Sequence, residues 1–230
     1  MSVDISLRRG DRGLIVGQSG SGKTFVGIEL CRAMPRPLVV IDTKYSAGIA
    51  DLVKEDSANW SISEGAFPAI TKETRCVIWR PDPDTLSDPL AIDAPLVRLV
   101  DNHRACSVYI DEMYQLHKAG RPGPGIVGLF TRGREMGFCT LGGAQRPSWV
   151  SLFCMTESNR FYVMKLALPS DRKRVAEVLG EPDIEDVLLP PRWFWYMKEG
   201  EDLELIEPLT IRKKSDRVAK KDEPKRFTLI

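Results

Sequence analysis

The feature that most constrains the fold of this 230-residue chain is a glycine-rich segment near its amino end. Residues 17–24 match the pattern G-x-x-x-x-G-K-[ST] in full. An apolar run, 14–16, precedes the segment, and a helical stretch, 24–34, follows it until Pro35 and Pro37 end the helix. A strand, a glycine-rich turn and a helix in this order are the setting of a phosphate-binding loop, which a chance glycine-rich turn would lack.

The residue types of this loop suit a bound nucleotide. Gly17, Gly20 and Gly22 allow backbone N–H groups to wrap a β-phosphate, and the helix amino terminus adds its positive end. Lys23 is expected to reach the β- and γ-phosphates, and the Thr24 hydroxyl is expected to take one position on Mg²⁺. The sequence therefore predicts a site for ATP and Mg²⁺. Its binding residues are Gly17, Gln18, Ser19, Gly20, Ser21, Gly22, Lys23 and Thr24.

The rest of the chain repeats a short apolar run, a turn and a helical stretch. Apolar runs without alternation are typical of strands buried on both faces, and helices between such strands imply right-handed crossovers. The predicted strands are 38–41, 75–80, 107–111, 139–145 and 160–168, and the predicted helices are 89–105, 126–135 and 171–179. Residues 120–125, rich in glycine and proline, are expected to form a flexible loop. The predicted fold class is α/β, a mostly parallel P-loop sheet covered by helices on both faces.

The character of the sequence changes at Pro190. Aromatic residues from Trp193, an acidic turn and an apolar run that ends at Leu209 predict a β-hairpin at the sheet edge. From Arg212 to Arg226 there are eight basic and three acidic residues, which indicates a flexible basic tail. We therefore predict a P-loop ATPase core over 1–189, an edge hairpin of the same domain over 190–211 and a basic tail over 212–230.

Composition limits the broad class more than the function. With 43% hydrophobic and 28% charged residues the chain is typical of an ordinary globular protein, and its net charge of +1 decides nothing about nucleic-acid binding. The five cysteines are scattered without metal-ligand spacing, so we interpret them as buried residues in a reducing compartment. There is no apolar signal region or 18-residue apolar run, so a cytosolic location is expected.

A pair of carboxylates lies at the carboxyl end of the predicted strand 107–111. Asp111 ends that strand at the edge where ligands sit in open α/β sheets, and we expect it to hold Mg²⁺ from a strand that neighbours the phosphate-loop strand. Glu112 is placed to orient or deprotonate an attacking water. This pair favours an ATP-hydrolysing motor over a small GTPase or a kinase. The alternative, two surface carboxylates after a strand, is disfavoured by the phosphate loop upstream.

Three further residues are candidates for catalysis. Gln145 ends the next strand, where its amide could touch the γ-phosphate or the attacking water. Between these strands lie Arg132 and Arg134, and an arginine brought to a neighbour's γ-phosphate would stabilise charge in the transition state. Arg134 is the first choice and Arg132 the second, and the alternative is that both are solvated helix residues. The predicted catalytic set is Lys23, Glu112, Gln145, Arg134 and Arg132.

Four segments together resemble the HerA/FtsK superfamily of DNA-pumping ATPases. They are Asp42-Thr43-Lys44, Ile110-Asp111-Glu112, Thr131-Arg132-Gly133-Arg134-Glu135 and Gly143-Ala144-Gln145-Arg146-Pro147. The order Arg-Gly-Arg followed by Gln-Arg-Pro is the distinctive part, and the resemblance covers about residues 10–180. A bare motor of this length, without membrane segments or a long amino-terminal barrel, is most similar to the genome-packaging ATPases of tailless internal-membrane dsDNA viruses and phages.

This resemblance implies a RecA-like fold and an ATP-driven motor that packages double-stranded DNA into a preformed capsid. It implies a ring of the chain with itself, usually of six subunits, with ATP at the subunit interfaces and DNA in the pore. It also implies capsid-vertex or viral membrane proteins as partners, in the host cytoplasm or at the packaging vertex. Gln145 then corresponds to a sensor, and Arg132 or Arg134 to an arginine that acts on the neighbouring subunit.

The residues alone leave the DNA contacts open. Residues 118–121 could be a pore loop that follows phosphates or a solvated connector, and the basic tail could bind DNA or only aid solubility. Trp193, Phe194 and Trp195 could stack on bases, but edge packing or a subunit contact is favoured. Two other functions also stay open: a morphogenesis or secretion ATPase that moves protein or single-stranded DNA, and a nucleotide-dependent switch or adaptor, which Glu112 disfavours.

Overall fold

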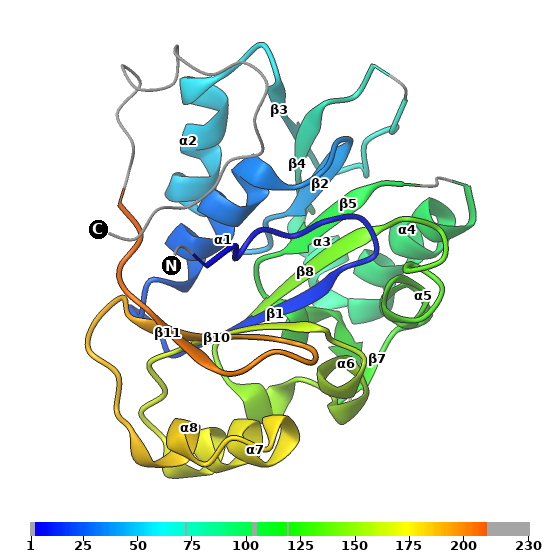
Figure 1. Ribbon diagram of the computed structural model, residues 1–230. Helices are drawn as coiled ribbons and strands as arrows, with labels where there is room; N and C mark the ends of the chain where they lie inside the picture. Colours follow the sequence, from blue (N-terminus) through cyan, green and yellow to red (C-terminus); the bar gives the residue numbers. More distant parts are fainter. Residues whose placement is uncertain (1–2, 72, 103–104, 119, 211–230) are drawn as a thin grey trace.

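The computed structural model describes residues 3–71, 73–102, 105–118 and 120–210 (Figure 1). Within these residues, nine strands form one sheet in the order β11-β10-β9-β1-β8-β5-β2-β4-β3. The strands are β1 (Arg12–Val16), β2 (Leu38–Ile41), β3 (Trp60–Glu64), β4 (Cys76–Arg80), β5 (Ser107–Ile110), β8 (Cys139–Ala144), β9 (Arg160–Met164), β10 (Phe194–Lys198) and β11 (Glu204–Ile206). All neighbouring pairs are parallel except those of β10, which is antiparallel to both β9 and β11. The mostly parallel α/β sheet is therefore confirmed.

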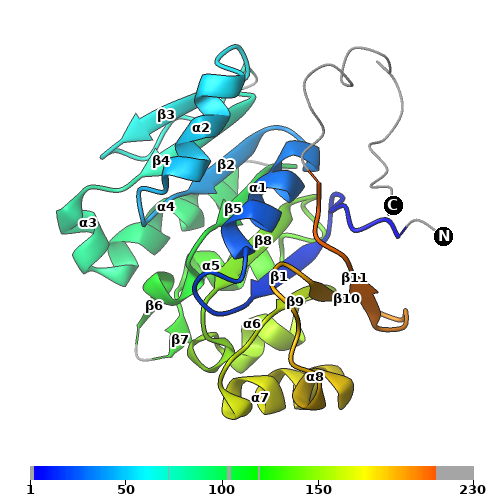
Figure 2. The ribbon, with the colours of Figure 1, turned by 90° about the vertical axis from the view of Figure 1, so that its left-hand side faces the viewer.

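Helices cover both faces of this sheet (Figures 1 and 2). One face carries α1 (Lys23–Ala33) and α2 (Ala47–Glu55). The other face carries α4 (Pro89–Asn102), α5 (Pro124–Phe130), α6 (Leu152–Thr156), α7 (Pro169–Leu179) and α8 (Asp183–Asp186). Short elements complete the described chain: α3 (Pro83–Ser87), the 3-10 helices η1 (Met113–Leu116) and η2 (Pro147–Trp149), and the paired strands β6 (His117–Lys118) and β7 (Arg121–Pro122).

The two faces bury two separate hydrophobic clusters. Along β2, Val39 and Ile41 join the cluster under α4 and α5, whereas Leu38 and Val40 join the cluster under α1 and α2. Successive side chains of a strand point to opposite faces, so a strand covered on both sides needs apolar residues at every position. This requirement explains the uninterrupted apolar runs in the sequence.

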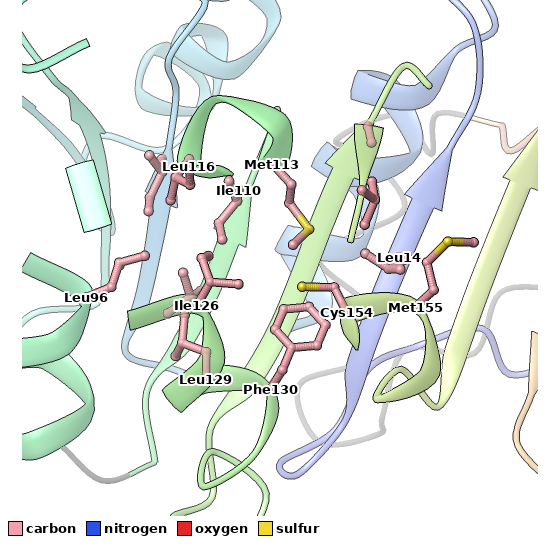
Figure 3. Packing of buried hydrophobic residues seen from close by; sticks show 14 of the residues in the cluster. Leu14, Leu96, Ile110, Met113, Leu116, Ile126, Leu129, Phe130, Cys154 and Met155 are labelled. Carbon is pink, nitrogen blue, oxygen red and sulfur yellow. The ribbon is translucent and has the colours of Figure 1, made fainter. Parts of the chain in front are cut away.

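One neighbour relation differs from the prediction. The acidic strand β5 is not adjacent to the phosphate-loop strand β1, because β8 is inserted between them. Two glycines of β8 allow this arrangement: a Cβ on Gly142 would lie 1.9 Å from the Met113 sulfur, and a Cβ on Gly143 would lie 2.5 Å from the Asp111 carbonyl oxygen. Figure 3 shows the side chain of Met113, from η1, lying over β8 on the face that also carries Cys154 and Phe130. The sequence therefore placed the two carboxylates at the carboxyl end of β5, as the structure has them, but it did not predict the order of the strands.

The predicted helix 126–135 is too long at its carboxyl end. Helix α5 ends at Phe130, and the next residues form turns in which the Gly133 N–H donates to the Gly128 carbonyl. A Cβ at Gly133 would lie 2.1 Å from the Leu129 carbonyl oxygen, so only glycine allows this tight exit from the helix. The predicted loop 120–125 is also partly wrong, since it contributes β7 and the first turn of α5. The prediction also missed α2, β3, α3, α6 and α8.

The predicted hairpin forms the edge of the sheet. Strands β10 and β11 pair antiparallel beside β9, and Phe194 is buried against the α1 face of the core. Trp195 packs on the opposite face. These contacts support edge packing for the aromatic segment. The basic tail, 212–230, lies outside the described residues.

The cysteines, His117 and the hydrophobicity of the helices can also be compared with the sequence predictions. All five cysteines are buried, as predicted, and burial raises the pKa of Cys76 and of Cys154 to about 11. His117 is buried with its Nδ1 2.7 Å from the Met113 carbonyl oxygen, which is a structural position. Among the helices of the described residues, none is long and apolar enough to cross a membrane.

Asp93 of α4 fastens α5 to the fold. Its carboxylate accepts hydrogen bonds from the backbone N–H of Gly125 at 2.7 Å and of Ile126 at 2.9 Å, and its side chain is buried. These N–H groups lie in the first turn of α5 and have no partner within the helix. Gly123 gives the carboxylate room, since a Cβ there would lie 2.3 Å from its Cγ.

We predict that Asp93→Ala lowers the free energy of unfolding by about 2–4 kcal/mol, because it leaves two buried N–H groups without an acceptor. Urea denaturation followed by circular dichroism measures this loss. Asp101→Ala is the matched control on the same helix, because its exposed ion pair with Arg132 should change stability by no more than about 0.5 kcal/mol. Equal stability of the two variants would contradict the proposed role of Asp93.

Candidate active site

The phosphate loop runs from the end of β1 to the start of α1, as predicted. Its first residues are tied to both neighbouring strands: the Gly17 N–H donates to the Ala144 carbonyl at 3.1 Å, and the Gln18 N–H donates to the Lys165 carbonyl at 3.0 Å. Gly20 and Gly22 adopt φ angles of 77° and 103°, in the left-handed region that favours glycine. The loop therefore ends directly at the amino terminus of α1, where backbone N–H groups are free to meet phosphate.

Gly17 is a point of close contact within this loop. A Cβ on Gly17 would lie 2.7 Å from the Ser21 hydroxyl oxygen and 2.8 Å from Cβ of Met164. The loop is thus packed against β9 without room for a larger residue at its first position.

Lys23 occupies the centre of the site. It is buried, and burial is the main cause that lowers the pKa of its ammonium group. The nearby charge of Lys44 lowers this pKa further, while Glu112 and Asp111 oppose the shift. The ammonium groups of Lys23 and Lys44 and the carboxylates of Asp111 and Glu112 therefore lie close together. The two ammonium groups would attract the negative charge of a bound polyphosphate.

Thr24 and Asp111 meet although β8 separates their strands. The Thr24 hydroxyl donates to Asp111 Oδ1 at 3.3 Å, and the buried Tyr109 hydroxyl donates to the same oxygen at 2.8 Å. Among the described residues, the other carboxylate oxygen, Oδ2, is buried and has no hydrogen-bond donor within bonding distance. An oxygen of this kind suits a hard cation such as Mg²⁺, as does the Thr24 hydroxyl.

These two side chains would form a partial coordination shell. Within the described residues, no group of three or more His, Cys, Asp or Glu side chains could hold a metal ion by itself. Mg²⁺ at nucleotide sites is commonly held by one or two protein oxygens, with phosphate oxygens and waters as the other ligands. Thr24 and Asp111 therefore fit the predicted ion.

Glu112 is fully buried at the end of β5. Its Oε1 accepts from the Gln145 backbone N–H at 3.2 Å, and its Oε2 accepts from the Lys44 ammonium at 2.5 Å. The structure therefore brings Glu112 and Gln145 together across β5 and β8. It also adds Lys44, which lies just beyond the end of β2.

A cavity of about 830 Å³ lies over these groups. It is lined by Ser19, Gly20, Gly22, Lys23, Thr24, Phe25, Lys44, Gln145, Arg192, Pro208, Leu209 and Thr210. A volume of this size is within the range of small-molecule sites. Arg192 and the segment 208–210 were not predicted, and they bring the end of the described chain to the phosphate loop.

The two candidate arginines lie at the amino ends of the strands, whereas the phosphate loop lies at their carboxyl ends. Arg132 and Arg134 are exposed on the turn that leads into the amino end of β8, beside Gly10 and the start of β1. A whole strand, which rises about 3.3 Å per residue, separates this turn from the phosphate loop of the same chain. Neither arginine can reach its own site, so a catalytic role is limited to the site of a neighbouring copy.

Lys44, which lines the cavity, was missed as a site residue, and Asp42 holds the turn that carries it. Asp42 is fully buried, and it accepts from the Ser46 N–H at 3.0 Å and from Arg80 Nε at 3.0 Å. Burial raises the pKa of Asp42, which these hydrogen bonds oppose. The position of Asp42-Thr43-Lys44 at the carboxyl end of β2 was the available signal, because the ends of parallel strands gather at one edge.

The Gln-Arg-Pro element is anchored through its arginine. Arg146 Nε donates to Asp171 of α7 at 3.0 Å, and its guanidinium lies 5.3 Å from the ring centre of Trp149. Trp149 in turn packs against Tyr114 with ring centres 5.1 Å apart. The segments that follow Glu112 and Gln145 are therefore in direct contact.

Fold and site together define a P-loop ATPase in which one strand separates the phosphate-loop strand from the acidic strand. No model of a known protein family matches the chain. Over 185 residues the chain is 29% identical to the DNA packaging ATPase P9 of Enterobacteria phage PRD1, a match that covers 77% of this chain and 74% of that protein.

Solved structures show the same fold. The DNA-packaging ATPase B204 of Sulfolobus turreted icosahedral virus has a TM-score of 0.63 at 13% identity, over 88% of this chain and 100% of that one. The genome packaging NTPase B204 of Sulfolobus turreted icosahedral virus 2, in complex with ATP-gammaS, has a TM-score of 0.59 at 14% identity, over 87% and 98%. The predicted resemblance to viral genome-packaging ATPases is thus confirmed.

We predict that Gly17→Ala weakens ADP binding about tenfold or more. The added methyl group must displace Ser21 or Met164, and overpacking of this kind costs about 1–3 kcal/mol. Isothermal titration calorimetry gives the Kd, and circular dichroism verifies the fold. Gly48→Ala is the control, because the nearest atom to its new Cβ lies at an ordinary 3.4 Å. An unchanged Kd in Gly17→Ala would contradict the tight packing of the loop.

Proposed function

We propose that this chain is an ATP-driven motor that moves double-stranded DNA into a preformed viral capsid. The observation that carries the ATPase part is the buried Glu112, which follows Asp111 at the carboxyl end of β5 and contacts Lys44 and Gln145, two residues that line the cavity. The DNA part is supported by the sequence similarity to the packaging ATPase of phage PRD1.

In this proposal, ATP occupies the cavity with its phosphates on the loop 17–24. Lys23 and the backbone N–H groups bind the β- and γ-phosphates, and Thr24 and Asp111 hold Mg²⁺. The ion, when bound, neutralises charge that develops on the phosphate oxygens. This arrangement fixes the γ-phosphate above the ends of β5 and β8.

Glu112 is the proposed general base. It takes a proton from water as the water oxygen bonds to the γ-phosphorus, and the bond to the bridging oxygen breaks to release ADP. Gln145 follows β8 at the same edge, and its amide would bind the γ-phosphate or that water. Glu112 and Gln145 are joined by a hydrogen bond, so a change at one reaches the other.

We further propose that the chain forms a ring, with six subunits as the expected number. Arg134, or else Arg132, would enter the neighbour's site and stabilise the transition-state charge. The placement of both arginines on the edge opposite the phosphate loop supports this role. The arginine of each subunit would then complete the active site of the neighbouring subunit.

The hairpin β6–β7 is the proposed DNA contact. The chain runs from Glu112 through η1 directly into this hairpin, whose Arg121 is exposed. An arginine here can bind DNA phosphates without reading their sequence. A movement of Glu112 during ATP hydrolysis would thus be transmitted to the hairpin through η1. We place the motor in the host cytoplasm or at the packaging vertex, where capsid or viral membrane proteins would be its partners.

We predict that double-stranded DNA stimulates ATP hydrolysis and that rising salt removes the stimulation, because phosphate contacts release counterions. Glu112→Gln should lower kcat by about 10²–10⁴-fold while ATP still binds. A phosphate-release assay across a salt series measures both effects, and Glu177→Gln on the exposed surface of α7 is the control.

Two results would contradict this proposal. Hydrolysis that is indifferent to DNA at every salt concentration would favour an ATPase that moves protein or single-stranded DNA. No hydrolysis by the unaltered chain would favour a nucleotide-dependent switch or adaptor.

The arginine role has its own test. Arg134→Ala and Lys23→Ala should each abolish turnover alone, but a mixture of both should regain about a quarter of the activity per site. In a random mixture about one interface in four pairs an intact phosphate loop with an intact arginine. Arg132→Ala is tested in the same way. Mixtures that stay inactive for both arginines would contradict action in the neighbouring site.

A further inference from the structure

Lys44 lies between the proposed base and the nucleotide cavity. Its ammonium nitrogen is 2.5 Å from Glu112 Oε2 and 3.8 Å from Asp111 Oδ2. The Lys44 side chain lines the cavity and is 30% exposed, whereas the Glu112 side chain is 0% exposed. A water in the cavity therefore meets Lys44 before it can meet Glu112.

The turn that carries Lys44 is braced on both sides. Before it, Asp42 is held by Arg80 and by the Ser46 N–H. After it, Tyr45 adopts a φ of 53°, a left-handed conformation that is unfavourable for a bulky residue. The Tyr45 hydroxyl donates to the Pro81 carbonyl, and the Arg80 guanidinium lies 5.3 Å from the centre of its ring. The fold thus maintains a strained turn from which the Lys44 side chain reaches Glu112.

The backbone of Lys44 is held by this turn, but its side chain can adopt other conformations. A lysine ammonium is a compact charge on a flexible stem of four carbons. The cavity that it borders also contains Lys23 and Thr24, which are the residues that would hold a γ-phosphate. A γ-phosphate carries more negative charge than one carboxylate, and it would compete with Glu112 for the same ammonium group.

We propose that Lys44 covers Glu112 while the site lacks a γ-phosphate, and moves to the γ-phosphate when ATP binds. Glu112 then becomes accessible to the attacking water only in a site loaded with ATP. ADP has no γ-phosphate, so it leaves Lys44 on Glu112. Lys44 acts as a positioning residue that couples the presence of ATP to the exposure of the base. This inference rests on the proposed ATP hydrolysis at the same site.

The first test compares two nucleotides. Calorimetry with a non-hydrolysable ATP analogue and with ADP gives two Kd values for each variant. We expect Lys44→Met to weaken the ATP analogue about tenfold and to change ADP less than about twofold, because only ATP would contact Lys44. Lys44→Arg should retain most of the affinity for the analogue. Lys54→Met, an exposed lysine on α2, is the control and should change neither value.

The second test detects the exchange itself. In Glu112→Gln, Lys44 has no carboxylate of Glu112 to leave, so the ATP analogue should bind more tightly. Lys44→Met should then cost more affinity for the analogue in the Glu112→Gln background than in the unaltered chain. If Lys44 instead stays on Glu112 in both states, its removal unmasks repulsion between Glu112 and the γ-phosphate. The larger loss would then occur in the chain that keeps Glu112.

Either that opposite order, or an equal loss of affinity for the ATP analogue and ADP, would overturn the proposal. Lys44→Met could destabilise the fold by leaving Glu112 buried and unpaired. The comparison in the Glu112→Gln background avoids this problem because residue 112 then carries no charge. These measurements need neither DNA nor turnover, so a failure of the motor function and a failure of this inference are distinguished.

Discussion

The contact between the Thr24 hydroxyl and the Asp111 carboxylate, 3.3 Å across an inserted strand, is the constraint on which the site depends. Strands β1 and β5 are not neighbours, so α1 must lie over β8 to bring Thr24 to Asp111. Gly27 of α1 makes this possible, because a Cβ there would lie 2.4 Å from the Tyr109 hydroxyl. That hydroxyl donates to Asp111, so one buried tyrosine takes part both in the packing of α1 and in holding the carboxylate that is proposed to bind Mg²⁺.

The inserted strand β8 also links Glu112 to Gln145. Its glycines bring the ends of β5 and β8 together, and the Gln145 N–H then reaches Glu112. Beyond the site, Tyr114 and Trp149 continue the contact between the two segments. Tyr114 belongs to η1, which continues into the β6–β7 hairpin. Arg146, which precedes Trp149 in the chain, binds Asp171 of α7. A continuous series of contacts therefore joins Glu112 and Gln145 to the β6–β7 hairpin and to α7.

The sequence predicted most of what local patterns encode. The phosphate loop is a continuous motif, and the buried strands appear as uninterrupted apolar runs, so both were found without a structure. The pair Asp111 and Glu112 was found because strand ends gather at one edge of a parallel sheet. In each case the relevant residues are adjacent in the chain.

What escaped prediction depends on contacts between distant segments. The position of β8 depends on the close contacts of Gly142 with Met113 and of Gly143 with the Asp111 backbone. Local sequence patterns do not reveal these contacts. The partner of Glu112 is Lys44, which is 68 positions away, and no spacing rule identifies it. The end of α5 was placed too late because the Gly133 turn interrupts an otherwise helical pattern.

The most direct test of the central claim is movement along DNA. A third strand bound to one end of a long duplex reports a translocating motor, since the motor displaces that strand on arrival. The account predicts displacement that requires ATP, is absent with ADP and is absent in Glu112→Gln. Robust ATP hydrolysis on the same duplex without displacement, at low salt and with the capsid vertex proteins supplied, would contradict a DNA-translocating motor.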